Sequence, residues 1–208
     1  MKRIVFTIAL GLGLLTVNAQ IQSLAGPRLG LVYISASPGS SFLNGDLRLE
    51  DIAELPEDYN DIAKGTLTSL YGWQWESRFA DGGNVTGIVE WIALVGGMEK
   101  GKFLPSVSSM VGARTASGLE FAVGPNLSLS GIAMVFGVGY NFKSGVLNMP
   151  VNIAFVPGRT VTQKNHKSGT AGDDNQWNTN DDTDGYDYTV DYHSGSRFSI
   201  TVGFNLSK

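Results

Sequence analysis

The stretch Val146–Val156 reads V-L-N-M-P-V-N-I-A-F-V, and Arg197–Leu206 near the C-terminus reads R-F-S-I-T-V-G-F-N-L. In both, every second residue is large and apolar, and the residues between are mostly small or polar. Successive side chains of a β-strand point to opposite faces, so each stretch predicts a strand with one apolar and one polar face. Such strands fit a transmembrane β-barrel, whose apolar face contacts lipid and whose polar face lines the lumen.

Together with these two stretches, eight segments of the sequence can be interpreted as strands. They are Arg28–Ala36, Thr66–Phe79, Asn84–Val95, Ser106–Thr115, Leu119–Asn126, Leu129–Phe142, Val146–Val156 and Ser196–Leu206. Most reach the length of about 9–11 residues that a tilted membrane strand needs. The predicted fold is therefore all-β: an eight-stranded antiparallel up-and-down transmembrane β-barrel with two long outer loops.

The lengths of the connections support this topology independently. The even-numbered links are all tight: Ala80–Gly83, Ala116–Gly118 and Lys143–Gly145. Three of the four odd-numbered links are longer, among them Ser37–Gly65 and Pro157–Gly195. Bacterial barrels combine short periplasmic turns with longer outside loops. The sorting of loops by parity therefore favours a membrane barrel over a soluble sandwich.

The N-terminus has the pattern of a secretory signal. Lys2 and Arg3 precede the apolar run Ile4–Leu15, and Val17-Asn18-Ala19 is a small-residue cleavage site. We predict a signal peptide at residues 1–19 and an outer-membrane β-barrel domain at residues 20–208. The expected location is the outer membrane of a Gram-negative bacterium, where lipid is the first partner.

The charge of the mature chain excludes one class of partner. Of 15 basic residues, 13 remain without Lys2 and Arg3, against 19 acidic residues, which gives a formal charge of −6. Phosphate binding needs a basic face, so nucleic acid is not expected as a partner. The chain has no cysteine, which excludes disulfides and thiolate metal sites.

Four runs carry a resemblance to a known group of proteins. They are G-P-N-L-S-L-S-G (Gly124–Gly131), G-V-G-Y-N-F-K-S-G (Gly137–Gly145), N-M-P-V-N-I-A-F-V-P (Asn148–Pro157) and R-F-S-I-T-V-G-F-N (Arg197–Asn205). The chain thereby resembles the C-terminal half of small outer-membrane β-barrel proteins of Bacteroidota type, and its architecture is similar to the OmpA/OmpX-like eight-stranded barrels. The resemblance implies a fold and a location, and no activity.

Charged residues recur on the polar faces of the predicted strands. They are Glu76, Arg78, Glu90, Arg114, Glu120 and Arg197. The interior of an eight-stranded barrel is just wide enough to be filled by side chains, and buried charges must pair. We therefore predict a Glu–Arg network that plugs the lumen. The alternative is a gated or narrow pore lined by the same groups.

The last long loop contains a candidate calcium site. Asn180, Asp182, Asp184 and Asp191 occupy positions one, three, five and twelve of a calcium-loop pattern, with Gly185 at the turn. Ca²⁺ prefers such hard oxygen ligands at alternate positions. Asp in place of Glu at the twelfth position and the absence of flanking helices favour the alternative, a solvated surface loop.

The first long loop predicts a short helix over the barrel mouth. Leu49, Ile52, Leu55, Tyr59 and Ile62 recur at near-helical spacing. Pro56 lies within this segment and would break or kink the helix. The acidic outer loops are also a candidate surface for an extracellular protein or a cation, because loops commonly carry binding.

No arrangement of residues indicates catalysis. The only histidines are His166 and His193, and Asp191 is too close in sequence to His193 for a triad. We therefore expect a non-enzymatic protein with no cofactor other than a calcium ion in the last loop. Two other classes stay open: a small porin-like channel, and a soluble calycin-like barrel that binds an apolar ligand and whose faces are inverted.

Overall fold

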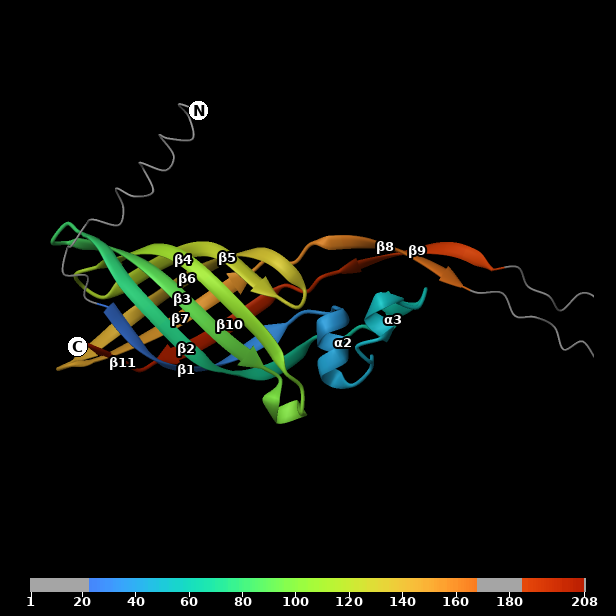
Figure 1. Cartoon of the computed structure of the whole chain (residues 1–208), viewed down its shortest axis with the longest axis horizontal. Coiled ribbons are helices and arrows are strands. Elements are labelled where there is room, and N and C mark those ends of the chain that lie inside the picture. The colour runs from blue at the N-terminus through green and yellow to red at the C-terminus, as the bar shows by residue number, and fades with distance from the viewer. Residues whose placement is uncertain (1–22, 168–184, 208) are drawn as a thin grey trace, which may run out of the picture.

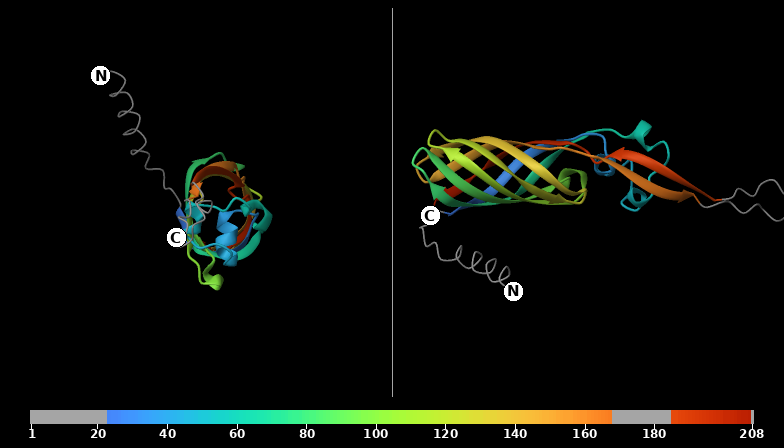
Figure 2. Two further views of the ribbon diagram at one scale, coloured as in Figure 1. Left: turned by 90° about the vertical axis from the view of Figure 1, so that its right-hand side faces the viewer. Right: turned by 90° about the horizontal axis from the view of Figure 1, so that it is seen from above.

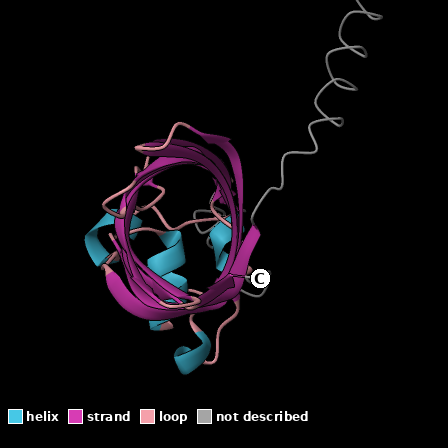
Figure 3. Cartoon of the chain, turned by 90° about the vertical axis from the view of Figure 1, so that its left-hand side faces the viewer, coloured by secondary structure: helices cyan, strands magenta, loops and turns pink. Residues whose placement is uncertain are grey.

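The strands form a closed antiparallel barrel (Figure 1, Figure 3). The computed structural model describes residues 23–167 and 185–207. The barrel strands are β1 (Ser23–Ile34), β2 (Thr66–Asp81), β3 (Val85–Gly96), β4 (Leu104–Thr115), β5 (Leu119–Ser128), β6 (Gly131–Ser144), β7 (Leu147–Val156), and β10 (Arg197–Gly203) continued by β11 (Asn205–Ser207). The predicted all-β class and eight-stranded up-and-down barrel are confirmed.

The first strand closes the barrel. Leu31 of β1 lies opposite Ser69 of β2 on one side and Ile200 of β10 on the other. The last predicted strand, Ser196–Leu206, is not continuous. It is interrupted at Phe204, whose N–H donates a hydrogen bond to the carbonyl of Pro27 at 3.0 Å.

The apolar faces of the strands point outward and the polar faces point inward. Ile200 is 48% exposed, whereas its neighbour Thr201 is 5% exposed. Large side chains cover the outside of every barrel strand, among them Leu31, Trp73, Trp75, Trp91, Val107, Phe121, Phe136, Ile153 and Phe198. The outer surface of the barrel is therefore apolar, and the buried charged side chains of the strands, among them Glu76, Glu90 and Arg114, lie within.

The two ends of the barrel differ. Three tight turns lie at one end, together with the start of β1 and the end of β11 (Figure 1). Gly118 and Gly145 in two of these turns have φ values of 99° and 62°, which glycine adopts without strain. We call this the turn end. The opposite, loop end carries the long connections and the short helix η2 (Met98–Lys100) between β3 and β4.

The first long loop folds into helices at the barrel mouth (Figure 2). Its first helix, α2 (Pro38–Asn44), is not expected from the sequence pattern and begins with a reciprocal cap between Ser37 and Ser40. The helix expected over Leu49–Ile62 is broken, as Pro56 within it suggests. Pro56 divides that segment into η1 (Asp51–Ala53) and α3 (Tyr59–Ile62), since proline cannot continue a helical hydrogen-bond ladder.

The second long loop is also more ordered than expected. Strands β8 (Thr160–Lys167) and β9 (Tyr186–His193) form a separate hairpin that extends beyond the barrel (Figure 2). The prediction of a plain surface loop over Pro157–Gly195 is therefore wrong for these two segments. Leu47, Leu55, Tyr59 and Val190 form an apolar cluster that joins the hairpin to the first loop. Such a contact between distant loops leaves no periodic signal.

No helix within residues 23–167 and 185–207 has both the length and the apolar character needed to cross a membrane.

Candidate functional site

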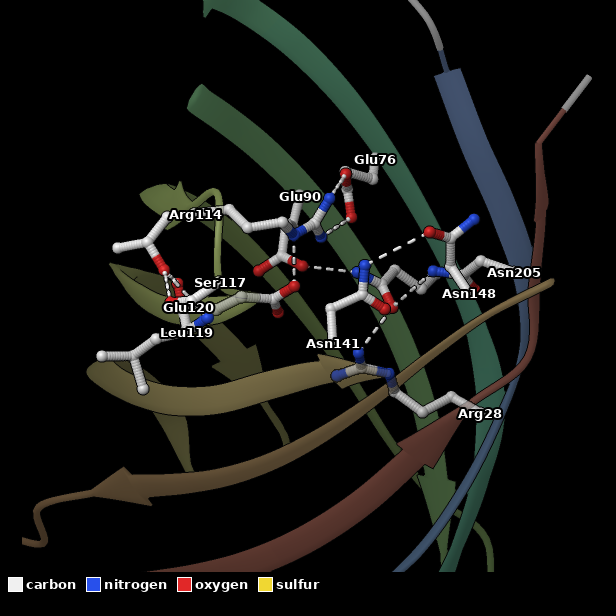
Figure 4. Close-up of polar contacts among 12 residues, drawn as sticks. Arg28, Glu76, Glu90, Arg114, Ser117, Leu119, Glu120, Asn141, Asn148 and Asn205 are labelled. Atoms are coloured by element: carbon white, nitrogen blue, oxygen red, sulfur yellow. Dashed lines mark hydrogen bonds and ion pairs between the residues drawn. The ribbon is translucent and has the colours of Figure 1, made fainter. Parts of the chain in front are cut away.

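The lumen near the turn end is filled by a network of ion pairs (Figure 4). Arg114 on β4 is its centre. Its Nη1 and Nη2 donate to the two carboxylate oxygens of Glu76 on β2, at 2.7 Å and 2.6 Å, and its Nε donates to Glu120 on β5. All three residues are buried. Because both partners of each pair are held on rigid strands, the pairs offset the cost of removing these charges from water.

A second part of the network joins β1, β2 and β3. Arg28 donates to Gln74 Oε1 at 2.5 Å and to Thr201 Oγ1 at 3.3 Å, and Gln74 donates to Glu90. Asn205 also donates to Gln74, at 3.4 Å. The charge reasoning on the sequence missed Arg28. The alternation Arg28, Gly30, Val32, Ile34 places it on the inner face and was the signal that could have found it.

The two remaining predicted members of the network are Arg78 and Arg197. Arg78 is half-buried on β2, close to the turn end. Arg197 stands at the start of β10, at the loop end, and forms no ion pair with the network. The prediction that Arg197 helps to plug the lumen is therefore wrong, because its strand begins at the opposite end of the barrel. We call the set Arg28, Gln74, Glu76, Glu90, Arg114 and Glu120 the floor network.

Above the floor network the lumen is hollow. A cavity of about 610 Å³ extends from Arg28, Glu90 and Glu120 to the loop end. The network therefore fills only part of the length of the lumen. We call this space the outer cavity.

The wall of the outer cavity is mainly apolar. Its lining includes Val32, Ile34, Leu70, Ile92, Leu94, Leu104, Met110, Val135 and Val156. They belong to two buried clusters inside the barrel. The inner face is thus mainly polar near the turn end and mainly apolar toward the loop end. The signal was visible on β3, whose inward Ile88 and Ile92 face the same side as Glu90.

The mouth of the outer cavity combines an apolar cover with two arginines. Pro38, Gly39 and Phe42 of α2 line the cavity at the loop end, and Leu43 packs against Val32 and Leu70. Arg159 and Arg197 line the same end. The acidic residues among the lining residues are Glu90 and Glu120, both in the floor network. Two arginines therefore face the cavity at its mouth, and the carboxylates that face it lie at the floor.

The loops at the mouth contain two groups with shifted pKa values. Desolvation acts against ionisation of the exposed Glu99 on η2, but hydrogen bonds from Ser69 and Thr68 outweigh this effect and hold the pKa of its carboxyl at about 2. Burial raises the pKa of the Tyr59 hydroxyl, against the effect of its hydrogen bond with Ser41 at 3.3 Å. Glu99 thereby ties the β3–β4 loop to β2 as a carboxylate.

The candidate calcium ligands are only partly described. Asn180, Asp182 and Asp184 lie outside the described residues. Asp191 lies on β9 and accepts a hydrogen bond from Thr162 of β8. Within the described ranges no three His, Asp or Glu side chains come together as a metal site.

The two histidines occupy the hairpin and its exit. His166 Nδ1 is 2.7 Å from Asp187 Oδ1 across the hairpin, and His193 Nδ1 accepts from the backbone N–H of Gly195 at 3.1 Å. Both side chains are exposed. Among the described residues, His193 forms no hydrogen bond with Asp191. The carboxylate of Asp191 accepts a hydrogen bond from Thr162 instead.

A comparison with models of known protein families finds no match for this chain, and a comparison with curated protein sequences finds none either.

Proposed function

We propose that this chain is an integral barrel protein of a Gram-negative outer membrane, of the OmpA/OmpX-like type. The observation that carries the proposal is the distribution of side chains on the barrel wall: apolar and aromatic outside, charged inside. The role is binding or structural and not catalytic, and the acidic loops at the loop end face the cell exterior, where an extracellular protein or a cation is the expected partner.

The exposed apolar surface supports a lipid environment. Soluble monomers rarely expose contiguous apolar patches larger than about 300–600 Å². Here large apolar side chains stand on the outside of neighbouring strands without interruption, as in the cross-strand pairs Trp75–Trp91 and Phe155–Phe198. A soluble calycin-like barrel requires the opposite arrangement, with the aliphatic face inside and Glu and Arg outside. The orientation of Glu76 and Arg114 therefore favours the membrane proposal.

The floor network favours a closed barrel over the channel alternative. Ion pairs among β2, β4 and β5 occupy the lumen beside these neighbouring strands, and Gln74 links Arg28 to Glu90 next to them. The interior of an eight-stranded barrel leaves little space once such side chains fill it. We expect planar bilayers that contain the protein to be electrically silent, and stable single-channel steps would support the channel.

Labelling of two adjacent residues tests the proposal. The natural chain has no cysteine, so Ile200→Cys and Thr201→Cys each introduce one reporter thiol. In proteoliposomes we expect the thiol at position 200 to react with a lipid-soluble maleimide and to be protected from a charged one. The thiol at position 201 is the matched control and should resist the lipid-soluble reagent. A protein that stays soluble without detergent, or a thiol at position 200 that reacts with the charged reagent, overturns the proposal.

A further inference from the structure

We propose that the outer cavity binds one hydrocarbon chain that carries an anionic head group, and that this chain enters sideways from the membrane between β6 and β7. The binding site does not depend on a membrane location. The sideways route rests on the proposed function, because it needs lipid around the barrel.

The shape and lining of the outer cavity fit a single hydrocarbon chain. Its volume of about 610 Å³ lies in the range of small-molecule sites, about 300–1,000 Å³. The lining extends along β1 from Arg28 to Ile34, a distance along the strand of about 20 Å at 3.3 Å per residue. Apolar side chains cover the wall between these two residues from several strands. The space is thus long, apolar and enclosed by strands.

The charges at its two ends orient such a ligand. The floor holds three glutamates and two arginines, which leaves one carboxylate in excess, and Glu120 Oε2 is a buried acceptor without a hydrogen-bond donor in the described chain. These carboxylates would repel an anionic head group at the floor. At the mouth, Arg159 and Arg197 line the cavity, and the Nε of Arg197 has no acceptor among the described residues. An anionic head group at the mouth would pair with these guanidinium groups while the chain points toward the floor.

The barrel wall is incomplete beside the mouth. β6 pairs with β7 from Ser144 to Phe136, where Phe136 lies opposite Phe155, and the pairing ends there. Residues 131–135 of β6 pair with β5 only. The chain after β7 continues into Pro157, which has no N–H to donate and cannot extend the ladder.

A second hollow marks this gap. It has a volume of about 230 Å³ and is lined by Ile132 and Met134 from the outer face of β6 and by Ala133 from its inner face. Arg159 and Arg197 line both this hollow and the outer cavity. We call it the lateral notch. It therefore adjoins the apolar exterior, the lumen and the two arginines, which is the geometry needed for a lipid chain to pass inward while its head group stays at the rim.

Photolabelling tests the binding site. The probe is a sixteen-carbon fatty acid with a diazirine near its methyl end, supplied to the full protein in phosphatidylcholine vesicles, with labelled residues identified by mass spectrometry. We expect labels on inward residues of the cavity wall such as Met110 and Val135. The fatty alcohol of equal length should label them several-fold less. Labels confined to outward residues overturn the site.

Two variants with matched controls sharpen this test. Val135→Trp should fill the cavity and reduce inward labelling at least tenfold, whereas Val123→Trp on the outer face of β5 should leave it unchanged. Arg197→Gln should weaken labelling by the acid several-fold and leave labelling by the alcohol unchanged. Arg48→Gln is its control, because Arg48 is exposed on the first loop. Equal labelling of all four variants overturns the proposal.

A removable cross-link tests the route. Phe136 lies opposite Phe155, and extending this register by two residues on each strand places Met134 opposite Pro157. A disulfide between Met134→Cys and Pro157→Cys should therefore close the lateral notch. We expect inward labelling by probe already in the bilayer to fall at least tenfold, and to return on reduction. The control pair, Val138→Cys with Ile153→Cys, joins residues already opposite each other and should change nothing. Unchanged labelling with the notch closed overturns the sideways route.

The outcomes separate this inference from the proposed function. A protein that fails to insert into vesicles, judged by flotation and by an unshifted band in unboiled electrophoresis, contradicts the membrane location. A protein that inserts but acquires no inward label contradicts the ligand site alone.

Discussion

The guanidinium group of Arg114 forms a bidentate pair with the carboxylate of Glu76 inside the lumen, with N–O distances of 2.7 Å and 2.6 Å. The two residues belong to β4 and β2, which are separated by β3. Their contact therefore bridges over the inner face of β3. Because Arg114 also donates to Glu120 on β5, one side chain connects three strands of the barrel.

Removing this arginine should destabilise the barrel strongly. Arg114→Met leaves Glu76 and Glu120 buried without their cation, and loss of one partner from a buried pair costs about 3–5 kcal/mol. Urea unfolding in phosphatidylcholine vesicles measures the change. Arg48→Met is the control: its pair with Glu50 is exposed, and exposed pairs contribute about 0–1 kcal/mol. Equal stability of the two variants would show that the floor network does not hold the barrel together.

The stability lost when a charge is placed on the outer wall should depend on the depth of the residue in the bilayer. Trp91 lies in the middle of β3 and Phe142 lies near the turn end of β6; both are exposed. We expect Trp91→Arg to cost about 2–4 kcal/mol and Phe142→Arg about 0–1 kcal/mol in a bilayer. The same unfolding assay measures both. A Trp91→Arg variant as stable as the natural protein would contradict the lipid environment.

Acid should release the β3–β4 loop. The pKa of Glu99 is about 2 in the folded protein, below its ordinary value near 4.5, because Ser69 and Thr68 donate hydrogen bonds to the carboxylate. The stabilisation is complete above the ordinary pKa and is lost as the pH falls from there through about 2. Hydrogen exchange of residues 97–102 between pH 6 and pH 2 measures it. Glu99→Gln should remove the pH dependence, and an unchanged profile in that variant would assign the transition to another group.

A single core residue should detach the hairpin from the first loop. Leu55 is fully buried, and its carbonyl accepts hydrogen bonds from Asn165 at 2.8 Å and from Tyr188 at 3.0 Å. Leu55→Ala should weaken this local unit by about 2–5 kcal/mol through the cavity it leaves. The expected readout is faster amide exchange in β8 and β9 with unchanged exchange in the barrel. Leu49→Ala is the control, since Leu49 is largely exposed. Faster exchange throughout the barrel would mean that the hairpin is not a separate unit.

Local patterns predicted the barrel well. The alternation around Ile153 and Ile200 identifies strands because period two is a property of the backbone itself. The tight even-numbered links between strands likewise predicted which strands are neighbours. The same patterns placed Glu76, Glu90, Arg114 and Glu120 on inner faces, where the structure finds them. The predicted strand Ser196–Leu206 follows a long loop, so the same patterns also placed Arg197 at the loop end. They could not show which inward residues of different strands lie at the same height, because that depends on strand stagger.

The sequence by itself therefore determined the strands, their order and which side of each strand is apolar, since these follow from local alternation and from the length of each connection. The tertiary structure decided how the lumen is divided. Closure of β1 onto β10 sets the stagger that gathers Arg28, Gln74 and Glu90 near the turn end and leaves Val32, Ile92 and Val135 around an open cavity. The pairing that stops at Phe136, and the contact of the β8–β9 hairpin with Leu55, also depend on residues far apart in the chain. No periodicity along one segment carries that information.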